Sequence, residues 1–248
     1  MNRASRVNSI LRLFTAEKPL WTAEEAAAAL EVSLSTAYRQ LSALMKAGLL
    51  DAVEGSRAYV LGPAIIELDR NIRMSDSLII AAKPAMRWLA EQAPVASIVL
   101  LCRLYRDRVM CIHQEEKPGT SGEVSYERGR LMPLFHGAPS KTIIAQLPSR
   151  RLAKIVTDAR AEGSVCNAQI SDFGALRPEL RQIRRQGFCI TRGEVDKGVV
   201  GVAVPLPTAR RGVAASLGIA CFGSPDDTTL VRVRALLVAT SETIKASM

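Results

Sequence analysis

The stretch SLSTAYRQLSALMKAGLL, from Ser33 to Leu50, predicts a helix with a defined start and a defined end. Ser33 can cap the helix, because its hydroxyl can accept a hydrogen bond from a backbone N–H of the first turn. Apolar residues then recur at three-to-four spacing, and Gly48 supplies a residue that readily takes the left-handed conformation that ends a helix. Taken alone, the stretch also fits an ordinary amphipathic helix, so its neighbours decide what it is.

The neighbours predict two further helices and a hairpin. Apolar residues from Val7 to Phe14 have helical spacing, and TAEEAAAAL opens with a capping box in which Thr22 and Glu25 satisfy each other's backbone N–H groups, which predicts a helix over about 22–30. After Gly48, two short strand patterns flank the turn Glu54–Ser56. Three helices followed by a hairpin is the order of a winged helix-turn-helix.

The rest of the chain predicts a second domain. GPAIIELDRNIRMS reads as a connecting helix with Pro63 at its start, and a further helix begins near Asp76 that Pro84 should kink or break. VASIVLLCRL and VMCIHQEE predict a β-hairpin, EVSYERG a further strand, and runs at 137–147, 149–161 and 172–186 helices. Two more β segments and a last helix, capped by Ser224 with Pro225 at its first position, complete an α+β domain on an antiparallel sheet.

Composition excludes several classes of protein. The 248 residues contain no apolar run near the roughly 20 residues that span a bilayer, and the start lacks the features of a signal peptide, so we expect a cytoplasmic protein that does not enter a membrane. The five cysteines are scattered without a CxxC pair, which argues against a disulfide framework or a structural zinc site and favours reduced thiols.

Net charge is +9, but the basic excess does not lie at the N-terminus. Residues 1–75 hold 9 basic and 8 acidic residues, whereas residues 76–248 hold 24 and 16. A nucleic-acid interface must therefore be inferred from the placement of individual basic residues. The later clusters, such as Arg181, Arg184 and Arg185, are interpreted as solvated surfaces.

In several segments the sequence resembles the isocitrate lyase regulator (IclR) family of bacterial transcription factors. The segments are RVNSILRLF, TAEEAAAAL, SLSTAYRQLSALMKAGLL, YVLGPAIIEL, RQGFCITRGEVDKGVVGVAVPL and GVAASLGIACFG, and the likeness extends over roughly 5–246. It implies a winged helix-turn-helix over 1–62, a linker helix over 63–75 and a GAF-like effector-binding domain over 76–248. It also implies a homodimer, or a tetramer built as a dimer of dimers, on a palindromic double-stranded DNA operator, with a small organic or aromatic acid as effector.

The resemblance assigns DNA contacts to the helix that follows Ser33. A recognition helix places its N-terminal residues near base edges, and hydroxyl, amide and guanidinium groups can bond bases or phosphates there. The predicted DNA-binding residues are Ser35, Thr36, Tyr38, Arg39, Gln40, Arg57, Arg3 and Arg6. The alternative is that the hydroxyl residues only cap the helix and the arginines are solvated. Glu31 and Ser33 stand where the family usually has glycine and proline.

The resemblance also assigns an effector pocket. Aligned without gaps, the family's ligand-binding positions fall on Gly137, Ala138, Thr191, Gly201, Gly218 and Ala220, and we add His136, which lies beside the expected pocket, and Ser216 as a polar contact. Several of them are glycine or alanine where the family has polar residues, so we expect a roomy, apolar cavity that suits a bulky or aromatic acid. The alternatives are that the glycines serve turns or bulges and that His136 is structural. Pro139 departs from the run of small residues that the family usually has there.

No arrangement of residues indicates an enzyme, a cofactor or a metal site. His113 and His136 are the only histidines and are not spaced with carboxylates as metal ligands, and there is no phosphate-binding glycine loop or nucleophile elbow. The resemblance implies a ligand-responsive transcriptional regulator, and we expect a repressor of a catabolic operon. Two alternatives stay open: a small-molecule-binding or catalytic protein whose N-terminal module contacts other proteins, and a redox-sensing regulator that uses Cys166.

Overall fold

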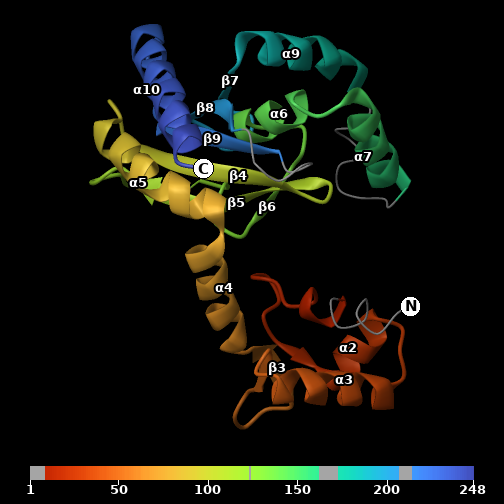
Figure 1. Ribbon diagram of the computed structural model, residues 1–248. Helices are drawn as coiled ribbons and strands as arrows, with labels where there is room; N and C mark the ends of the chain where they lie inside the picture. Colours follow the sequence, from red (N-terminus) through yellow and green to blue (C-terminus); the bar gives the residue numbers. More distant parts are fainter. Residues whose placement is uncertain (1–8, 123, 162–172, 207–213) are drawn as a thin grey trace. The chain divides into compact units, whose positions relative to one another are not determined.

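The computed structural model describes residues 9–122, 124–161, 173–206 and 214–248 (Figure 1). The chain divides into two compact units, Met1–Asp76 and Ser77–Met248. Each unit has its own buried apolar cluster. Arg3 and Arg6 of the predicted DNA contacts, and Cys166 of the redox alternative, lie outside the described residues.

The first unit combines helices with a small antiparallel sheet in the order β1-β3-β2. Its elements are β1 (Trp21–Thr22), α2 (Ala23–Ala29), α3 (Leu34–Lys46), β2 (Leu50–Ala52), β3 (Ala58–Leu61) and α4 (Ala64–Ser75), and residues 9–11 are also helical. Ile10, Ala26, Leu41 and Leu50 are buried in its core. This is the helix-turn-helix with a hairpin that the sequence predicts.

Both predicted helix starts in this unit are formed. Thr22 N donates to Glu25 Oε2 at 2.8 Å and Glu25 N donates to Thr22 Oγ1 at 3.2 Å, which is the capping box of α2. Ser33 Oγ accepts from Thr36 N at 3.3 Å and caps α3. The capping box thus fixes where α2 begins, and the Ser33 cap fixes where α3 begins, directly after the connection between the two helices.

The turns of the unit depend on two residues with a left-handed backbone, Gly48 and Glu31, and on the close approach of two chain segments at Gly62. Gly48 has φ 68° and its N–H donates to Met45 O, while Leu49 N donates to Leu44 O, so α3 ends in a Schellman motif. A Cβ on Gly62 would lie 2.3 Å from Gly48 O, so only glycine fits there. Glu31 has φ 53° and takes the left-handed conformation that residues other than glycine rarely adopt.

The second unit is built on a six-stranded antiparallel sheet in the order β6-β5-β4-β9-β8-β7. The strands are β4 (Ser97–Tyr105), β5 (Arg108–Glu116), β6 (Leu131–Met132), β7 (Cys189–Arg192), β8 (Val199–Leu206) and β9 (Ala215–Phe222). The helices are α5 (Ser77–Gln92), α6 (Ala138–Ala145), α7 (Ser149–Ala161), α9 (Phe173–Gln186) and α10 (Asp227–Ala246). The α+β architecture on an antiparallel sheet agrees with the prediction.

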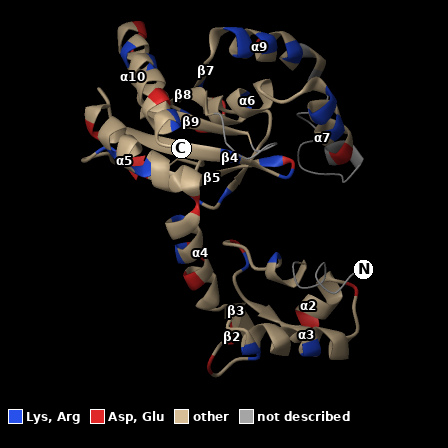
Figure 2. Cartoon of the chain, in the orientation of Figure 1, with Lys and Arg blue, Asp and Glu red and all other residues tan. Residues whose placement is uncertain are grey.

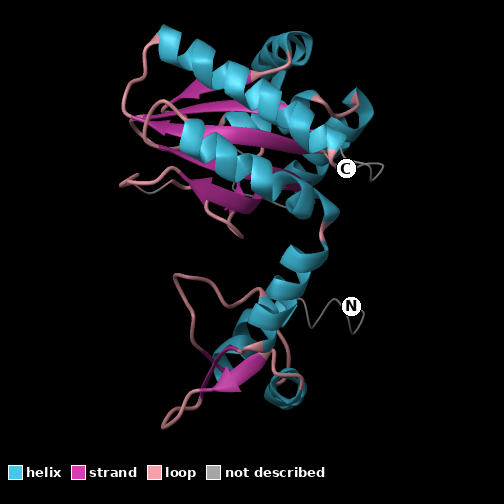
Figure 3. Cartoon of the chain, turned by 60° about the vertical axis from the view of Figure 1, so that its left-hand side comes forward, coloured by secondary structure: helices cyan, strands magenta, loops and turns pink. Residues whose placement is uncertain are grey.

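Helices cover both faces of this sheet. Alternate residues of β4 point to opposite sides, so Ile98 and Leu100 belong to one apolar cluster, and Val99 and Leu101 to the other. The long helices α5 and α10 lie side by side on one face (Figure 3). On the other face α6 packs against β8 and β9, and α9 packs against α6. Burial on both faces explains why the central strands are continuous apolar runs rather than alternating ones.

Three expectations about elements are wrong. Residues 124–127 of EVSYERG form no strand, and only an isolated bridge joins Arg128 to Cys111, because the edge strand is Leu131–Met132 instead. Of the kink or break expected at Pro84, the break does not occur, because α5 runs through to Gln92 with its apolar face buried. The cap of α10 is Asp226, whose Oδ1 accepts from Thr229 N at 2.7 Å, and not Ser224.

Candidate functional site

The outer face of α3 carries most of the predicted DNA contacts. Ala37, Leu41 and Leu44 face the core, which leaves Ser35 and Arg39 exposed and Thr36 and Gln40 partly exposed. The hydroxyls of Ser35 and Thr36 lie 3.2 and 2.8 Å from Ser33 Oγ. These hydroxyls therefore belong to the cap network and also lie at the N-terminal end of the helix. Among the described residues, none forms a hydrogen bond or an ion pair with the Arg39 side chain.

Tyr38 and Arg57 lie beside α2. The Tyr38 hydroxyl donates to Glu24 Oε1 at 3.1 Å, although 43% of the residue is exposed. A backbone hydrogen bond, the Tyr38 hydroxyl and the charge of Arg57 lower the pKa of the Glu24 carboxyl. Arg57 is exposed in the turn between β2 and β3 and is close enough to act on that carboxyl. Tyr38 thus has a structural contact that the sequence did not indicate.

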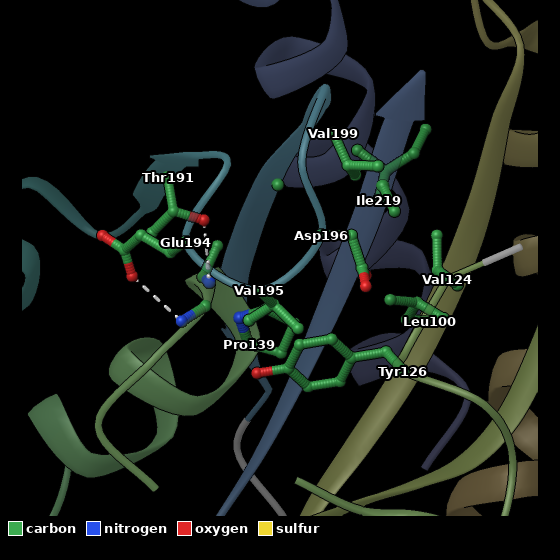
Figure 4. Close-up of a pocket in the computed structure, with 14 residues that line it drawn as sticks. Leu100, Val124, Tyr126, Pro139, Thr191, Glu194, Val195, Asp196, Val199 and Ile219 are labelled. Atoms are coloured by element: carbon green, nitrogen blue, oxygen red, sulfur yellow. Dashed lines mark hydrogen bonds between the residues drawn. The ribbon is translucent and has the colours of Figure 1, made fainter. Parts of the chain in front are cut away.

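The second unit contains a small cavity at the N-terminal end of α6 (Figure 4). Five of the predicted ligand-binding residues line it: Gly137, Ala138, Thr191, Gly201 and Ala220. Its other walls come partly from the segments 135–141, 191–202 and 216–220 that the resemblance implies, namely Pro139, Glu194, Val195, Asp196, Val199 and Ile219, and partly from Leu100, Val124 and Tyr126, which the sequence analysis did not identify. At roughly 30 Å³ for each water-sized group, the cavity volume of about 30 Å³ holds about one such group.

Protein groups already occupy the polar positions of this cavity. Gly137 N donates to Glu194 Oε2 at 3.0 Å, and Ala138 N donates to Thr191 Oγ1 at 3.1 Å. These two N–H groups lie at the start of α6, where the helix dipole favours negative charge. The carboxylate of Glu194 therefore sits where a carboxylate ligand would be most stable.

Glu194 also belongs to an ion-pair network. Lys141 Nζ lies 2.7 Å from Glu194 Oε1 and 2.9 Å from Glu179 Oε1, and 8% of the Lys141 side chain is exposed. Burial lowers the pKa of Lys141, but its hydrogen bonds to Glu194 and Glu179 outweigh burial, so the pKa is raised overall. Lys141 is thus charged and links α6 to α9 and to the turn between β7 and β8.

The expected roominess of the cavity is wrong. A Cβ on Gly137 would lie 2.6 Å from the Tyr126 hydroxyl and 2.9 Å from Val195 Cγ2, and one on Gly218 would lie 3.2 Å from Pro139 Cγ. One on Gly201 would lie 3.0 Å from Thr191 Oγ1. The space that the missing side chains leave is filled by neighbouring protein groups, so the glycines serve close packing.

The other predicted pocket residues lie around the cavity rather than in its wall. Ser216 Oγ donates to Pro139 O at 3.2 Å, and Gly218 packs against Pro139. The carbonyl of His136 accepts from the Tyr126 hydroxyl at 2.9 Å. Glu194 and Asp196 lie in the polar turn GEVDKG between β7 and β8, within the wall segment 191–202 that the resemblance implies, although neither was named as a ligand contact.

Two hydrogen bonds between Ser125 and Asp196, here called the latch, lie at one side of the cavity. Ser125 N donates to Asp196 Oδ2 at 2.9 Å, and the Ser125 hydroxyl donates to Asp196 Oδ1. Beyond this latch lies a wider hollow of about 470 Å³, which shares Val124 and Asp196 with the cavity. Asp196 and Ser125 therefore separate the cavity from that hollow.

Other kinds of site are not indicated in the described parts of the chain. No group of three or more His, Cys, Asp or Glu residues there could hold a metal ion. Four cysteines, Cys102, Cys111, Cys189 and Cys221, are free and buried, and burial raises the pKa of both Cys189 and Cys221 to about 12. Among the same residues, no helix is long and apolar enough to cross a membrane.

Family models match most of the chain. Residues 73–245 match the model described as bacterial transcriptional regulator IclR C-terminal, and residues 9–53 match a helix-turn-helix domain. Among curated proteins, the chain is 26% identical to the HTH-type transcriptional regulator KipR of Bacillus subtilis, over 86% of this chain and 83% of that protein. It is 30% identical to the HTH-type transcriptional regulator Rv1719 of Mycobacterium tuberculosis, over 86% and 78%.

Solved structures share the fold. An IclR family transcriptional regulator from Brucella abortus matches with a TM-score of 0.81 and 22% identity, over 99% of this chain and 91% of that chain. An IclR homologue from Microbacterium hydrocarbonoxydans, crystallised with 4-hydroxybenzoate, matches with a TM-score of 0.75 and 19% identity, over 99% and 100%.

Proposed function

Because the chain belongs to the IclR family of bacterial transcriptional regulators, we propose that it binds a palindromic operator as an oligomer and responds to a small organic acid. DNA binding through the helix-turn-helix and binding of a small-molecule effector are properties of this family. Membership of the family confirms that the chain is a transcriptional regulator and not an enzyme. It thereby rejects the alternative of a catalytic protein whose N-terminal module contacts other proteins.

The observation that carries the proposal is the outer face of α3. Ser35, Thr36, Arg39 and Gln40 are accessible there, while the opposite face of the same helix is buried. A guanidinium can fork onto a guanine or onto a phosphate, and an amide can bond an adenine. We assign Arg39 to a base or phosphate contact and Ser35, Thr36 and Gln40 to supporting contacts. Arg57 of the hairpin turn is proposed as a phosphate contact, as are Arg3 and Arg6.

Residues 1–62, 63–75 and 76–248 are proposed as the DNA-binding domain, the linker helix and the effector-binding domain. The division into two compact units at Asp76 supports the second boundary. Leu68 and Ile72 of α4 are 51% and 55% exposed and lie four residues apart, on one side of the helix. Apolar side chains in this arrangement favour pairing with a second copy of the helix, so α4 is the proposed dimer contact. The dimer, or a tetramer made from two dimers, would match a palindromic operator.

The proposed effector site is the cavity at the start of α6. An organic acid could bond Gly137 N and Ala138 N, where Glu194 and Thr191 now accept hydrogen bonds. The cavity of about 30 Å³ must open to admit even a small acid, so ligand binding and a change of structure are coupled. An aromatic acid is a reasonable effector, since a family structure of the same fold was crystallised with 4-hydroxybenzoate. Repression of a catabolic operon is the proposed direction of control.

Replacing Arg39 tests the DNA-binding assignment. Fluorescence anisotropy with DNA from upstream of the protein's own gene should show binding by the wild type that Arg39→Ala weakens about 10- to 100-fold. Arg70→Ala is the matched control, because Arg70 is an exposed arginine on α4. Equal binding by all three proteins would overturn the assignment. Circular dichroism establishes that the variants are folded.

A further inference from the structure

A groove separate from the effector cavity lies between the C-terminal end of α6, the start of α7 and one side of α9. Its volume is about 250 Å³, and none of its lining residues lines the effector cavity. Taking roughly 30 Å³ for each water-sized group, it has room for about eight such groups. This is the size of an organic molecule with six to eight carbons.

The groove has an apolar floor. Ile144 and Leu147, at the end of α6 and just after it, are 0% and 2% exposed, and Leu180 of α9 is 6% exposed. Such a floor can contact the hydrocarbon part of a ligand, and binding is favoured because the ligand's own apolar surface leaves water.

The rim of the groove is basic. Arg177, Arg181 and Arg184 are spaced four and three residues apart on α9, so they share one side of the helix, and all three line the groove. Figure 2 shows the basic residues gathered along α9. Glu179 is the only acidic residue between Phe173 and Gln186, and Lys141 pairs with it.

Arg184 and Arg181 differ in their hydrogen bonds. Arg184 Nε donates to Ala145 O at 2.6 Å and its Nη2 donates to Leu147 O at 2.8 Å, which fixes its positive charge at the groove. Arg181 is exposed, and in the described parts of the chain it has no recorded hydrogen bond or ion pair. A fixed cation and an unpaired cation above an apolar floor match a carboxylate with an apolar body.

α6 connects this groove to the effector cavity. Ala138 and Pro139, at its N-terminal end, line the cavity, and Ile144 and Ala145, at its C-terminal end, line the groove. The helix has 8 residues, all buried, so its ends are only about 12 Å apart. A displacement of α9 would also shift the cavity-lining residue Glu194, because Lys141 pairs with both Glu179 of α9 and Glu194.

We propose that the groove between α6, α7 and α9 is a second ligand site, which binds monocarboxylic acids with an apolar body of six to eight carbons. Aliphatic and aromatic acids share this chemistry. Binding there is coupled through α6 to the effector cavity. The coupling rests on the proposed function, whereas the binding itself does not.

Calorimetric titration of the full-length protein tests the binding. Hexanoate and benzoate represent the aliphatic and aromatic acids, acetate carries the charge without the apolar body, and hexanol carries the body without the charge. Hexanoate, benzoate or both should bind more tightly than acetate and hexanol. Arg181→Gln should weaken that binding at least about tenfold, because one charge-assisted hydrogen bond to a carboxylate is lost.

Arg185→Gln is the matched control, since Arg185 is exposed on the same helix but does not line the groove. It should leave affinity within twofold of the wild type. Equal binding by Arg181→Gln and the wild type, acetate binding as tightly as hexanoate and benzoate, or no saturable binding would each overturn the site. An oligomeric state that changes in Arg181→Gln, with no loss of acid binding, would identify the groove as a contact between copies and overturn it as well.

A second readout separates the coupling from the proposed function. In the wild type, hexanoate or benzoate should change DNA affinity in the anisotropy assay, and in Arg181→Gln this response should be reduced. If Arg181→Gln lost acid binding but the acid still changed its DNA affinity as in the wild type, the coupling to DNA binding would be overturned, whereas the ligand site itself would stand. Failure to bind DNA at all would contradict the proposed function, while the calorimetry would still decide the site.

Discussion

At the scale of single residues, one backbone position of the first unit is strained. Glu31 occupies a left-handed position with φ 53° between α2 and α3. A residue with a Cβ is strained there, because its Cβ approaches the following carbonyl. The turn is held by backbone hydrogen bonds from Leu30 N to Ala26 O and from Val32 N to Ala27 O, and by the Ser33 cap of α3.

Replacing Glu31 with glycine should stabilise the first unit. Relief of the left-handed strain outweighs the larger unfolded-state entropy of glycine, so the free energy of unfolding should rise by about 0.5–1 kcal/mol. Urea denaturation followed by circular dichroism measures it. Glu67→Gly is the control, since glycine inside α4 should lower stability by about 1 kcal/mol. A loss of stability in Glu31→Gly would contradict the strain.

The buried thiols make stability fall at alkaline pH. Cys189 and Cys221 ionise near pH 12 in the folded chain and near their ordinary value of 9.0 when unfolded. Between these values the unfolded state holds fewer protons, so stability is intact below pH 9 and is lost as pH rises, by about 1.4 kcal/mol for each thiol at pH 10. Urea midpoints at pH 8 and pH 10 should therefore differ less in Cys189→Ala than in the wild type. The same difference in both proteins would argue against burial of this thiol.

At the scale of helices and strands, caps decide where elements begin. Asp226 caps α10 through Thr229 N at 2.7 Å, although Ser224 and Pro225 in the sequence suggested an earlier start. Hydrogen bonds from the side chain and the backbone of Thr229 lower the pKa of Asp226. The cap therefore contributes above the ordinary carboxyl pKa of 3.8 and is lost as pH falls through the lower folded value.

Of the two candidate cap residues, only Asp226 should lower thermal stability when it is replaced. We expect Asp226→Ala to lower the thermal midpoint at pH 7, and Ser224→Ala to leave it unchanged. Differential scanning calorimetry measures both, and repeating it below the folded pKa of Asp226 should narrow the gap between Asp226→Ala and the wild type. If Ser224→Ala were the more destabilising change, the helix would begin where the sequence suggested.

Local signals predicted some elements and missed others. The capping box at Thr22, the Ser33 cap and the Gly48 stop depend on neighbours in sequence, and these helix ends form as expected. The strand expected in EVSYERG does not form, because this segment follows the cavity wall, where Ser125 bonds to Asp196 and Tyr126 bonds to Ser140. Those partners are 71 and 14 residues away, so spacing within the segment could not indicate them.

At the scale of the whole molecule, the predicted pocket segments do meet. Gly137 and Thr191 are far apart in sequence and line one cavity with Ala220. Its size could not be predicted, because the sequence shows where side chains are missing but not which neighbours fill the space. Tyr126 and Val195 fill the space beside Gly137.

The oligomer should depend on the apolar residues of α4. The double variant Leu68→Glu, Ile72→Glu places charges on two side chains that are more than half exposed in the single chain, so folding should survive while self-association weakens. Sedimentation velocity should show a dimer or tetramer for the wild type and smaller species for the variant. Asn71→Glu is a control on the same helix, at a position that does not carry an apolar side chain. An unchanged oligomeric state in the double variant would contradict the assignment of the dimer contact to α4.

The central claim is that a small acid in the second unit changes the DNA affinity of the first. The most direct measurement is a salt-controlled anisotropy titration of upstream DNA, with and without a panel of aromatic and short aliphatic acids. The account predicts sequence-selective binding that at least one acid shifts, by an amount set by the difference in its affinity for the free and DNA-bound protein. Binding without sequence preference, with the same affinity in the presence of every acid, would show only attraction between a basic protein and DNA and would contradict the claim.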